Sequence, residues 1–317
     1  MILPWAKLRP GDRIGVITPC GPISALALAE GSAVIQSWGC EVVLGAYVEP
    51  HLSATADEAP GALAEGSTTP ARGQEDHHFL AGPDGHRLAD LHWALNDPSL
   101  SAVMIGRGGY GISRIVDRVQ LASTLPRRPV IGFSDVTCLH EKFAAAGLPS
   151  IHGPNVSALR SDSVAADSLR SLLFDHQLPS LFTDAVVLRH GTSQGVLRGG
   201  NLTILAANAG TPSSLPGLPF VAVLEDTNEP PYKVDRMLTQ LLRSGWFENA
   251  TGVLSGKWSG CGDQNQVQAI LAERLLPEIV GPIVTNASFG HDSRNLALPL
   301  GVPVELSTAP PVLRGCS

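Results

Sequence analysis

Residues 130–147 place a serine where a catalytic nucleophile is expected. An apolar stretch that begins at Val130 predicts a buried strand, Gly132 permits a sharp turn, and apolar residues at helical spacing predict a helix that ends at Gly147. Ser134 lies at the apex of this strand-turn-helix unit, which is how a serine hydroxyl is lifted out of a sheet. A serine in front of a helix is more often an N-cap, so that alternative stays open at this point.

Backbone amides are predicted near this serine in two places. The first turn of the helix, starting near Asp135, points its amides at the space beside the hydroxyl, where they would stabilise developing negative charge. The segment 106–111 holds four glycines in six residues, which lets a backbone approach a ligand closely. A tight strand-to-helix turn explains this segment equally well, and its spacing fits no phosphate-binding motif.

A serine needs a base, and the base needs an acid that orients it. The apolar strand predicted over 220–224 runs directly into Glu225 and Asp226, at the strand end where α/β proteins usually bind ligands. A second strand, predicted over 282–285, leads to His291. The simpler interpretation is that Glu225 and Asp226 are solvated loop acids and that His291 is one of ten histidines in the chain.

The elements that position these residues fit an α/β protein of two domains. Strand, helix and strand at the N-terminus indicate a parallel crossover, and the chain becomes irregular and serine-rich before short strands resume at Gly195. We expect an N-terminal parallel-sheet α/β domain over 1–165, a linker over 166–194, and a smaller β-rich domain over 195–317, with the active site between the domains. Expected strands are 13–18, 41–44, 102–105, 130–131, 195–197, 220–224, 252–255, 282–285 and 302–306; expected helices are 25–38, 85–95, 136–146, 167–174, 202–209 and 232–244. Residues 53–76 read as a long loop.

Composition restricts the ligand and the compartment. The 317 residues carry a net charge of -7 and no run of Lys or Arg, which argues against nucleic acid and an anionic membrane surface as partners. The five cysteines are scattered without a CxxC pair, so neither a disulfide framework nor a zinc site is expected. No stretch suggests a signal peptide or a membrane span. We therefore expect a cytoplasmic protein with a small ligand and no metal or other cofactor.

Six sequence blocks together resemble the LD-carboxypeptidase family, the murein tetrapeptide carboxypeptidases. They follow that family's order across nearly the whole chain: Gly106–Gly111, Gly132–Asp135, His152–Pro154, Gly199–Leu202, Leu224–Asp226 with Pro231–Leu238, and Phe289–His291 with Leu298–Gly301. The resemblance implies a serine peptidase with a Ser-His-Glu triad that is shared between two domains, and commonly a homodimer.

On this resemblance Ser134 is the nucleophile, His291 the base and Glu225 the orienting acid. The backbone amides of Gly109 and Asp135 would form the oxyanion hole. The reaction implied is hydrolysis of an L,D amide bond that releases a C-terminal D-amino acid, typically D-Ala from murein tetrapeptide. A free substrate carboxylate then needs a partner, and the candidates for substrate binding are Arg107, Tyr110, Lys233 and Arg294, with Arg236 as a cation that is equally suited to an ion pair with Asp235.

Two departures from the family pattern affect these expectations. The segment 53–76 is longer than the family suggests, which leaves the substrate open. Asp292 follows the histidine where a small or apolar residue is expected, and its charge would raise the pKa of the imidazole.

Two alternative functions remain open. One keeps the same hydrolase chemistry and acts on a peptide-nucleotide antibiotic or another natural product, as the related microcin immunity peptidases do. The other is a ligand-binding homologue without catalysis.

Overall fold

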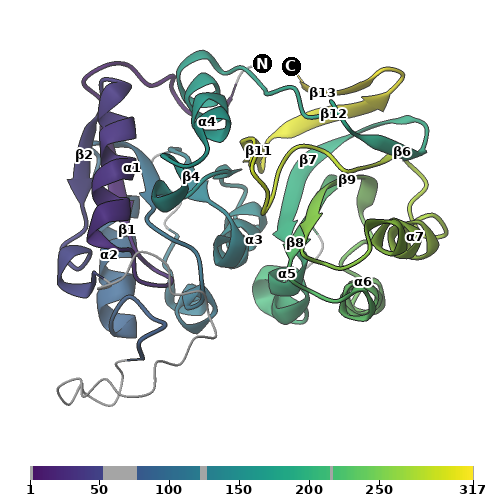
Figure 1. Ribbon diagram of the computed structural model, residues 1–317, viewed down its shortest axis with the longest axis horizontal. Helices are drawn as coiled ribbons and strands as arrows, with labels where there is room; N and C mark the ends of the chain where they lie inside the picture. The colour runs from purple at the N-terminus through teal and green to yellow at the C-terminus, as the bar shows by residue number, and fades with distance from the viewer. Residues whose placement is uncertain (1–2, 53–76, 122–126, 215–216, 317) are drawn as a thin grey trace.

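The protein is built from two β-sheets that lie side by side, each covered by helices (Figure 1). The structure, a computed structural model, describes residues 3–52, 77–121, 127–214 and 217–316. The loop predicted over 53–76 lies outside the described residues. Sequence order is kept in space, since the N-terminal half forms one side of the molecule and most of the C-terminal half the other.

The first sheet is parallel except at one edge. Its strand order is β11-β5-β4-β3-β1-β2, and only the β11–β5 pair is antiparallel. Because parallel strands need crossover connections, helices lie on both faces. The strands are β1 (Arg13–Ile17), β2 (Glu41–Leu44), β3 (Leu100–Ile105), β4 (Val130–Gly132), β5 (Ser150–His152) and β11 (Leu298–Leu300); the helices are α1 (Ala25–Ser37), α2 (Asp84–Asn96), α3 (Thr137–Ala145) and α4 (Ser163–Asp175).

Alternate strand residues supply the two apolar layers of this sheet. Val16 packs in one core cluster with Ile35 of α1 and Leu169 of α4, while Ile17 packs on the opposite face with Leu91 of α2 and Leu139 of α3. The nucleophile unit predicted over 130–147 is therefore β4 followed by α3, inside a fully covered sheet.

The second sheet is mixed, with order β13-β12-β7-β8-β9-β10-β6. Strands β7 to β10 are parallel neighbours, and the three outer pairings are antiparallel. The strands are β6 (Val186–Arg189), β7 (Thr192–Asn201), β8 (Phe220–Thr227), β9 (Ala250–Ser259), β10 (Ile283–Thr285), β12 (Pro303–Thr308) and β13 (Pro311–Gly315); the helices are α5 (Leu202–Asn208), α6 (Pro231–Arg243) and α7 (Gln264–Leu275).

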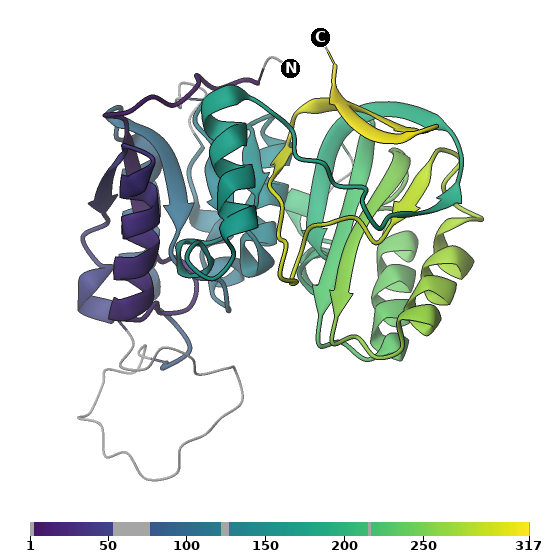
Figure 2. The same ribbon diagram turned by 45° about the horizontal axis from the view of Figure 1, so that its top comes forward.

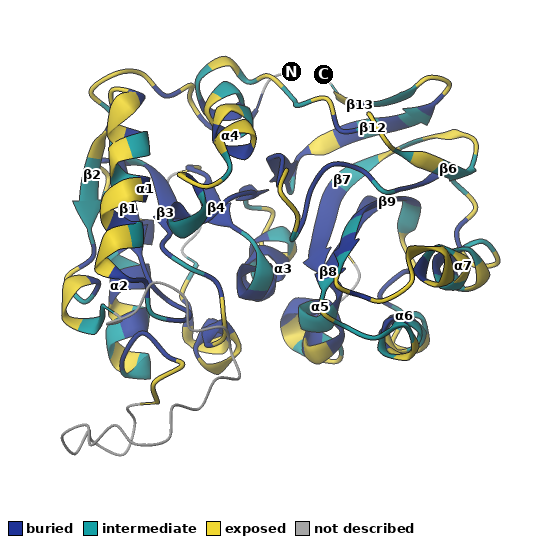
Figure 3. Ribbon diagram, in the orientation of Figure 1, coloured by how far each residue is buried: buried dark blue, intermediate teal, exposed yellow. Residues whose placement is uncertain are grey.

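Strand β8 lies at the centre of this half and is buried on both faces (Figure 3). Ala222 and Leu224 pack with α5, α6 and α7, while Val221 and Val223 pack with residues of β11 and β12. The two-domain α/β fold is thus confirmed, although the second half carries more helix than we expected. The missed helix α7 has readable signals, since Asp263 caps it and Val267 and Leu271 are buried at helical spacing.

The stretch 166–194 holds packed structure that belongs to both halves. Most of α4 lies in it and packs against the first sheet, whereas β6 pairs with β10 of the second. The domain limits therefore stay a prediction. The chain also returns late to the first sheet, because β11 of the C-terminal half pairs with β5 (Figure 2).

A buried ion pair joins the two halves beside the nucleophile helix. Arg198 of β7 donates two hydrogen bonds, of 3.1 and 2.8 Å, to the Glu141 carboxylate of α3. The indole of Trp246 donates a third, 2.9 Å long, to the same carboxylate. Arg198 and Glu141 are almost wholly buried, so the pair is well satisfied and fixes α3 against β7.

Candidate active site

Ser134 lies on a strained turn between β4 and α3. Its φ of 67° is in the left-handed region, which non-glycine residues seldom occupy. The serine begins one short 3₁₀ turn, 134–136, and neither that turn nor α3 is capped by a side chain. Ser134 is therefore not an N-cap, and the simpler reading of this residue is wrong.

The glycine-rich loop lies directly against this turn. A Cβ atom added at Gly108 would stand 3.1 Å from Cβ and 3.5 Å from Oγ of Ser134, so any larger residue would have to push the serine turn away. Gly109 has a φ of 104°, which also favours glycine. The Asp135 carboxylate accepts a 2.9 Å hydrogen bond from the amide of Ile112, just beyond the loop, and so ties the loop to the serine turn.

Sequence reasoning missed the arginine that supports this loop. Arg87 of α2 is buried and donates to the carbonyl of Gly111 at 2.9 Å, as well as to the carbonyls of Pro19 and Gly82. Its position on the apolar face of α2, four residues before Leu91, is a signal that the sequence did contain.

Glu225 and His291 meet although 66 positions separate them. Glu225, near the carboxyl end of β8, is completely buried, and its Oε2 accepts hydrogen bonds from Nδ1 (2.7 Å) and the backbone amide (3.1 Å) of His291. The imidazole itself is 20% exposed, so substrate has access to it. The second Glu225 contact, to the backbone, fixes where the histidine enters the site.

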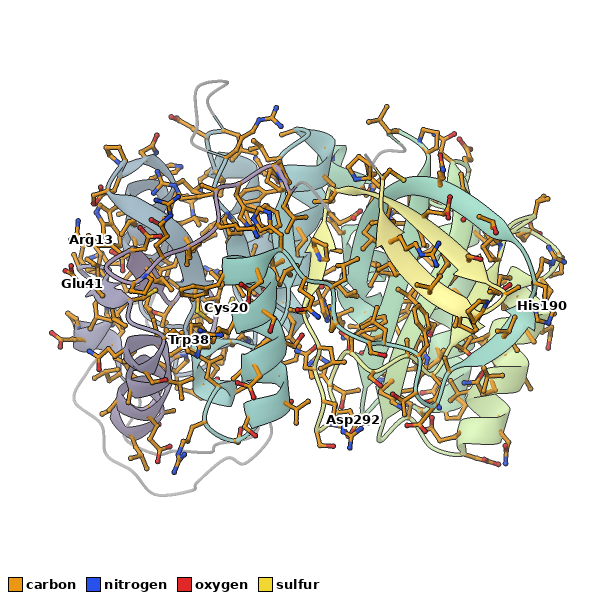
Figure 4. All side chains as sticks on the ribbon, turned by 90° about the horizontal axis from the view of Figure 1, so that it is seen from above. Arg13, Cys20, Trp38, Glu41, His190 and Asp292 are labelled. Atoms are coloured by element: carbon orange, nitrogen blue, oxygen red, sulfur yellow. The ribbon has the colours of Figure 1, made fainter. Side chains whose placement is uncertain are left out.

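The two groups stabilise each other's charge. Burial raises the pKa of Glu225, but the charge and hydrogen bonds of His291 outweigh it, and the pKa is lowered. Burial lowers the pKa of His291, but the charge and hydrogen bond of Glu225, with a further charge from Asp226, raise it overall. Asp292, the expected source, is exposed at the surface between the two halves (Figure 4), where its carboxylate accepts the Ser293 amide at 2.7 Å. The raised pKa therefore has its main sources in Glu225 and Asp226.

Asp226 faces away from the imidazole because side chains alternate along a strand. It accepts hydrogen bonds from Asn201 Nδ2 (2.8 Å) and from the amide and hydroxyl of Thr203 (2.9 and 2.8 Å). Burial and the charge of Glu225 raise its pKa to about 6. Asp226 thus anchors the start of α5, and of the two acids only Glu225 holds the histidine.

Phe133 connects the nucleophile turn to the Glu225–His291 pair, because its ring packs against that of His291. Its ring centroid lies 4.7 Å from that of His291, and Phe133 directly precedes Ser134. Asn155, which follows β5, accepts a 3.3 Å hydrogen bond from the Phe133 amide and so supports the turn.

The candidate substrate-binding residues have different surroundings. Arg107 donates to the carbonyl of Pro22 at 3.3 Å, and Lys233 forms an ion pair with Glu229 at 3.2 Å. Tyr110 and Arg294 are exposed, and the Tyr110 ring lies 5.9 Å from that of Phe79. Arg236 stands over the ring of Tyr232, whereas Asp235 pairs with Arg274, so the ion pair considered between Arg236 and Asp235 is not the one that forms.

Among the residues that the structure describes, no group of three or more His, Cys, Asp or Glu side chains is arranged to hold a metal ion. Within the same ranges, no helix combines the length and the apolar character needed to cross a membrane.

A strained serine, a glycine loop packed on it and a carboxylate-bound imidazole are typical of serine hydrolases. Comparison with known proteins defines the family. Residues 14–153 match the N-terminal domain and residues 194–306 the C-terminal domain of LD-carboxypeptidases. The chain belongs to the LD-carboxypeptidase family, and it is a serine peptidase.

Individual relatives agree with this assignment. A protein of Streptomyces coelicolor that is named a carboxypeptidase is 37% identical, over 95% of this chain and 92% of its own. The murein tetrapeptide carboxypeptidase of Pseudomonas aeruginosa is 30% identical over 91% of each chain. Among solved structures, an MccF-like protein of Bacillus anthracis has a TM-score of 0.77 at 22% identity, covering 96% of this chain and 95% of its own, and shares the fold.

Proposed function

We propose that this peptidase removes the C-terminal D-Ala from murein tetrapeptide, by cleaving an L,D amide bond with Ser134, His291 and Glu225. One observation carries the proposal: the His291 ring contacts both the carboxylate of Glu225, which binds its Nδ1, and the ring of Phe133, the residue next to Ser134. An imidazole so held has Nε2 available to accept a proton from a serine. The murein substrate is supported by the relative of that name from Pseudomonas aeruginosa.

The proposed reaction begins with attack of Ser134 Oγ on the amide carbonyl while His291 Nε2 takes the hydroxyl proton. Negative charge on the tetrahedral oxygen is stabilised by the amides of Gly109 and Asp135. Collapse breaks the C–N bond, and His291 returns the proton to the leaving amine of D-Ala. Water then attacks the acyl-enzyme with the same proton transfers, which releases the tripeptide and restores Ser134. Glu225 stabilises the imidazolium in both steps.

The test is incubation with L-Ala-γ-D-Glu-meso-diaminopimelyl-D-Ala, with product analysis by mass spectrometry. We expect a tripeptide and free D-Ala, and no cleavage of the isomer that ends in L-Ala. Ser134→Ala should abolish turnover while peptide binding and thermal stability remain. An unchanged rate in this variant would show that Ser134 is not the nucleophile.

A second candidate is cleavage of a peptide-nucleotide antibiotic. It is favoured by the exposed rings of Phe79 and Tyr110 beside the glycine loop, 42% and 45% exposed, because such rings stack with planar bases. Failure to cleave the tetrapeptide together with cleavage of an aminoacyl-nucleotide would select this function. Arg107, Tyr110, Lys233 and Arg294 remain the proposed substrate contacts in either case.

The family resemblance suggests the oligomeric state, and the sequence suggests the location. We expect a homodimer, to be checked by light scattering of the purified chain, and a cytoplasmic location, to be checked by cell fractionation.

A further inference from the structure

A set of buried polar atoms lies behind the Glu225–His291 pair. Oε1 of Glu225, both ring nitrogens of His152 and Nδ2 of Asn295 have no hydrogen-bond partner among the described residues, although each is shielded from solvent. Leaving a buried polar atom unpaired costs about 1–3 kcal/mol, so several together at one site need an explanation.

His152 is the last residue of β5, where it lies beside Gly132 of β4 and opposite Leu298 of β11. The edges and faces of two aromatic rings enclose it, with centroids 6.0 Å away at Phe133 and 5.7 Å away at Phe289. The ring is fully buried between them, so neither nitrogen can obtain its hydrogen bond from bulk solvent.

The groups that face this imidazole come from several elements. Glu225 of β8 and His291 both act electrostatically on His152, and the side chain of Asn295 lies against its ring. His140 of α3 lies 6.4 Å away, ring to ring, with its Nε2 at 2.9 Å from the Gly132 carbonyl. Burial lowers the pKa of His152 to about 4, so the ring is neutral at neutral pH, with one N–H donor and one acceptor.

Asn295 connects this ring to the loop that carries His291. Its Oδ1 accepts a 2.9 Å hydrogen bond from the backbone amide of Gly290, and its backbone N–H donates to Asp162 Oδ2 at 3.1 Å. Its side-chain NH₂ group therefore remains available as a donor.

We propose that His152 is a positioning residue for Glu225: after a small local shift its ring N–H donates to Oε1, the carboxylate oxygen that His291 does not use, and its other ring nitrogen accepts from Asn295. Donors and acceptors then balance. The ring N–H of His152 and the side-chain NH₂ of Asn295 are the two donors, and Oε1 of Glu225 and the second ring nitrogen of His152 are the two acceptors. The inference rests on the proposed role of Glu225 in orienting His291.

Such a contact has a specific use in the reaction. A carboxylate held at one oxygen can rotate about its last side-chain bond, whereas one held at both oxygens fixes the plane of the imidazole. A neutral donor provides this without cancelling the charge that stabilises the imidazolium, as a Lys or Arg would do.

The experiment compares two variants at one position. His152→Leu keeps most of the volume and removes both nitrogens, while His152→Asn retains a donor close to the position of Nδ1. With murein tetrapeptide as substrate, we expect His152→Leu to lower kcat about 10- to 100-fold, the effect of one unpaired buried group, with little change in KM. We expect His152→Asn to recover most of kcat. Ile151→Val, a neighbouring change in buried volume without polar atoms, is the control and should keep the wild-type kcat.

The pH profile separates positioning from packing. In His152→Leu the fall of kcat/KM at acidic pH should begin at a higher pH. The charge of Glu225 is then compensated by His291 alone, so it favours the imidazolium more strongly and raises the pKa of His291. A folded His152→Leu enzyme with the wild-type kcat and pH profile would overturn the proposal. Equal losses in the Leu and Asn variants would also overturn it, since they would indicate a requirement for ring shape.

A measurement without substrate keeps the inference testable if His152→Leu does not fold, or if the tetrapeptide is not the substrate. In ¹⁵N-histidine-labelled protein we expect His152 to stay neutral between pH 5 and 8, with one N–H proton whose resonance shifts in Glu225→Gln. An unchanged resonance would refute the contact with Glu225 independently of the proposed function.

Discussion

Gly108→Ala tests whether the glycine loop and the serine turn act as one catalytic unit. The added Cβ would lie 3.1 Å from Ser134 Cβ and 3.4 Å from Asn155 Nδ2. Gly108 does not have a positive φ, so alanine meets no backbone strain at this position. The effect of the substitution is therefore a local push on the nucleophile turn.

The expected magnitude follows from the contact distance. Ordinary carbon contacts begin at about 3.4–3.5 Å, so Ser134 and the loop must separate by a few tenths of an ångström, about 0.3–0.4 Å. Since a 1 Å misplacement costs about 100-fold in rate, we expect kcat to fall about 4- to 6-fold. Overpacking should also lower stability by about 1–3 kcal/mol, which leaves the protein folded.

The assay is steady-state release of D-Ala from murein tetrapeptide, together with a thermal melt of each protein. Gly85→Ala is the matched control, because it makes the same change in α2, with no atom within 4 Å of the new Cβ. It should keep the wild-type kcat and gain up to about 1 kcal/mol of stability. A wild-type kcat in folded Gly108→Ala would refute the reasoning that Ser134 reacts against this loop.

Three further predictions concern the acid, the base and the junction between the halves. Glu225→Gln should lower kcat about 10⁴-fold, as loss of the orienting charge does in serine peptidases, and a loss below about tenfold would contradict the proposed triad. Because the pKa of His291 is raised above 6.5 and catalysis needs the neutral imidazole, kcat/KM should fall with decreasing pH through a midpoint above 6.5. Glu225→Gln should move that midpoint to lower pH. An unmoved midpoint would show that a group other than His291 causes the fall in kcat/KM at acidic pH. Arg198→Met leaves Glu141 as a buried charge with Trp246 as its remaining donor and should cost about 3–5 kcal/mol, measured by urea denaturation; a loss below about 1 kcal/mol would show that the ion pair does not hold the halves together.

The local elements of the fold were readable from the sequence. The strand-turn-helix unit at 130–147 appears as β4 and α3, and the strand predicted at 41–44 appears as β2 with the same limits. These elements combine apolar periodicity with a turn residue, and both are local properties. Strand β11, three residues long, was missed, since its apolar run is too short to be distinguished from a loop.

The sequence by itself determined which chemical groups were available: a serine on a tight turn, glycines that admit a close backbone, and acids and a histidine at strand ends. The tertiary structure decided which of them meet. Strand alternation selects Glu225 over Asp226 as the partner of His291, and the long-range pairing of β5 with β11 brings His152 and Asn295 behind that pair. These outcomes depend on register and sheet order, because contacts between distant segments are set by packing and not by the spacing of residues along the chain.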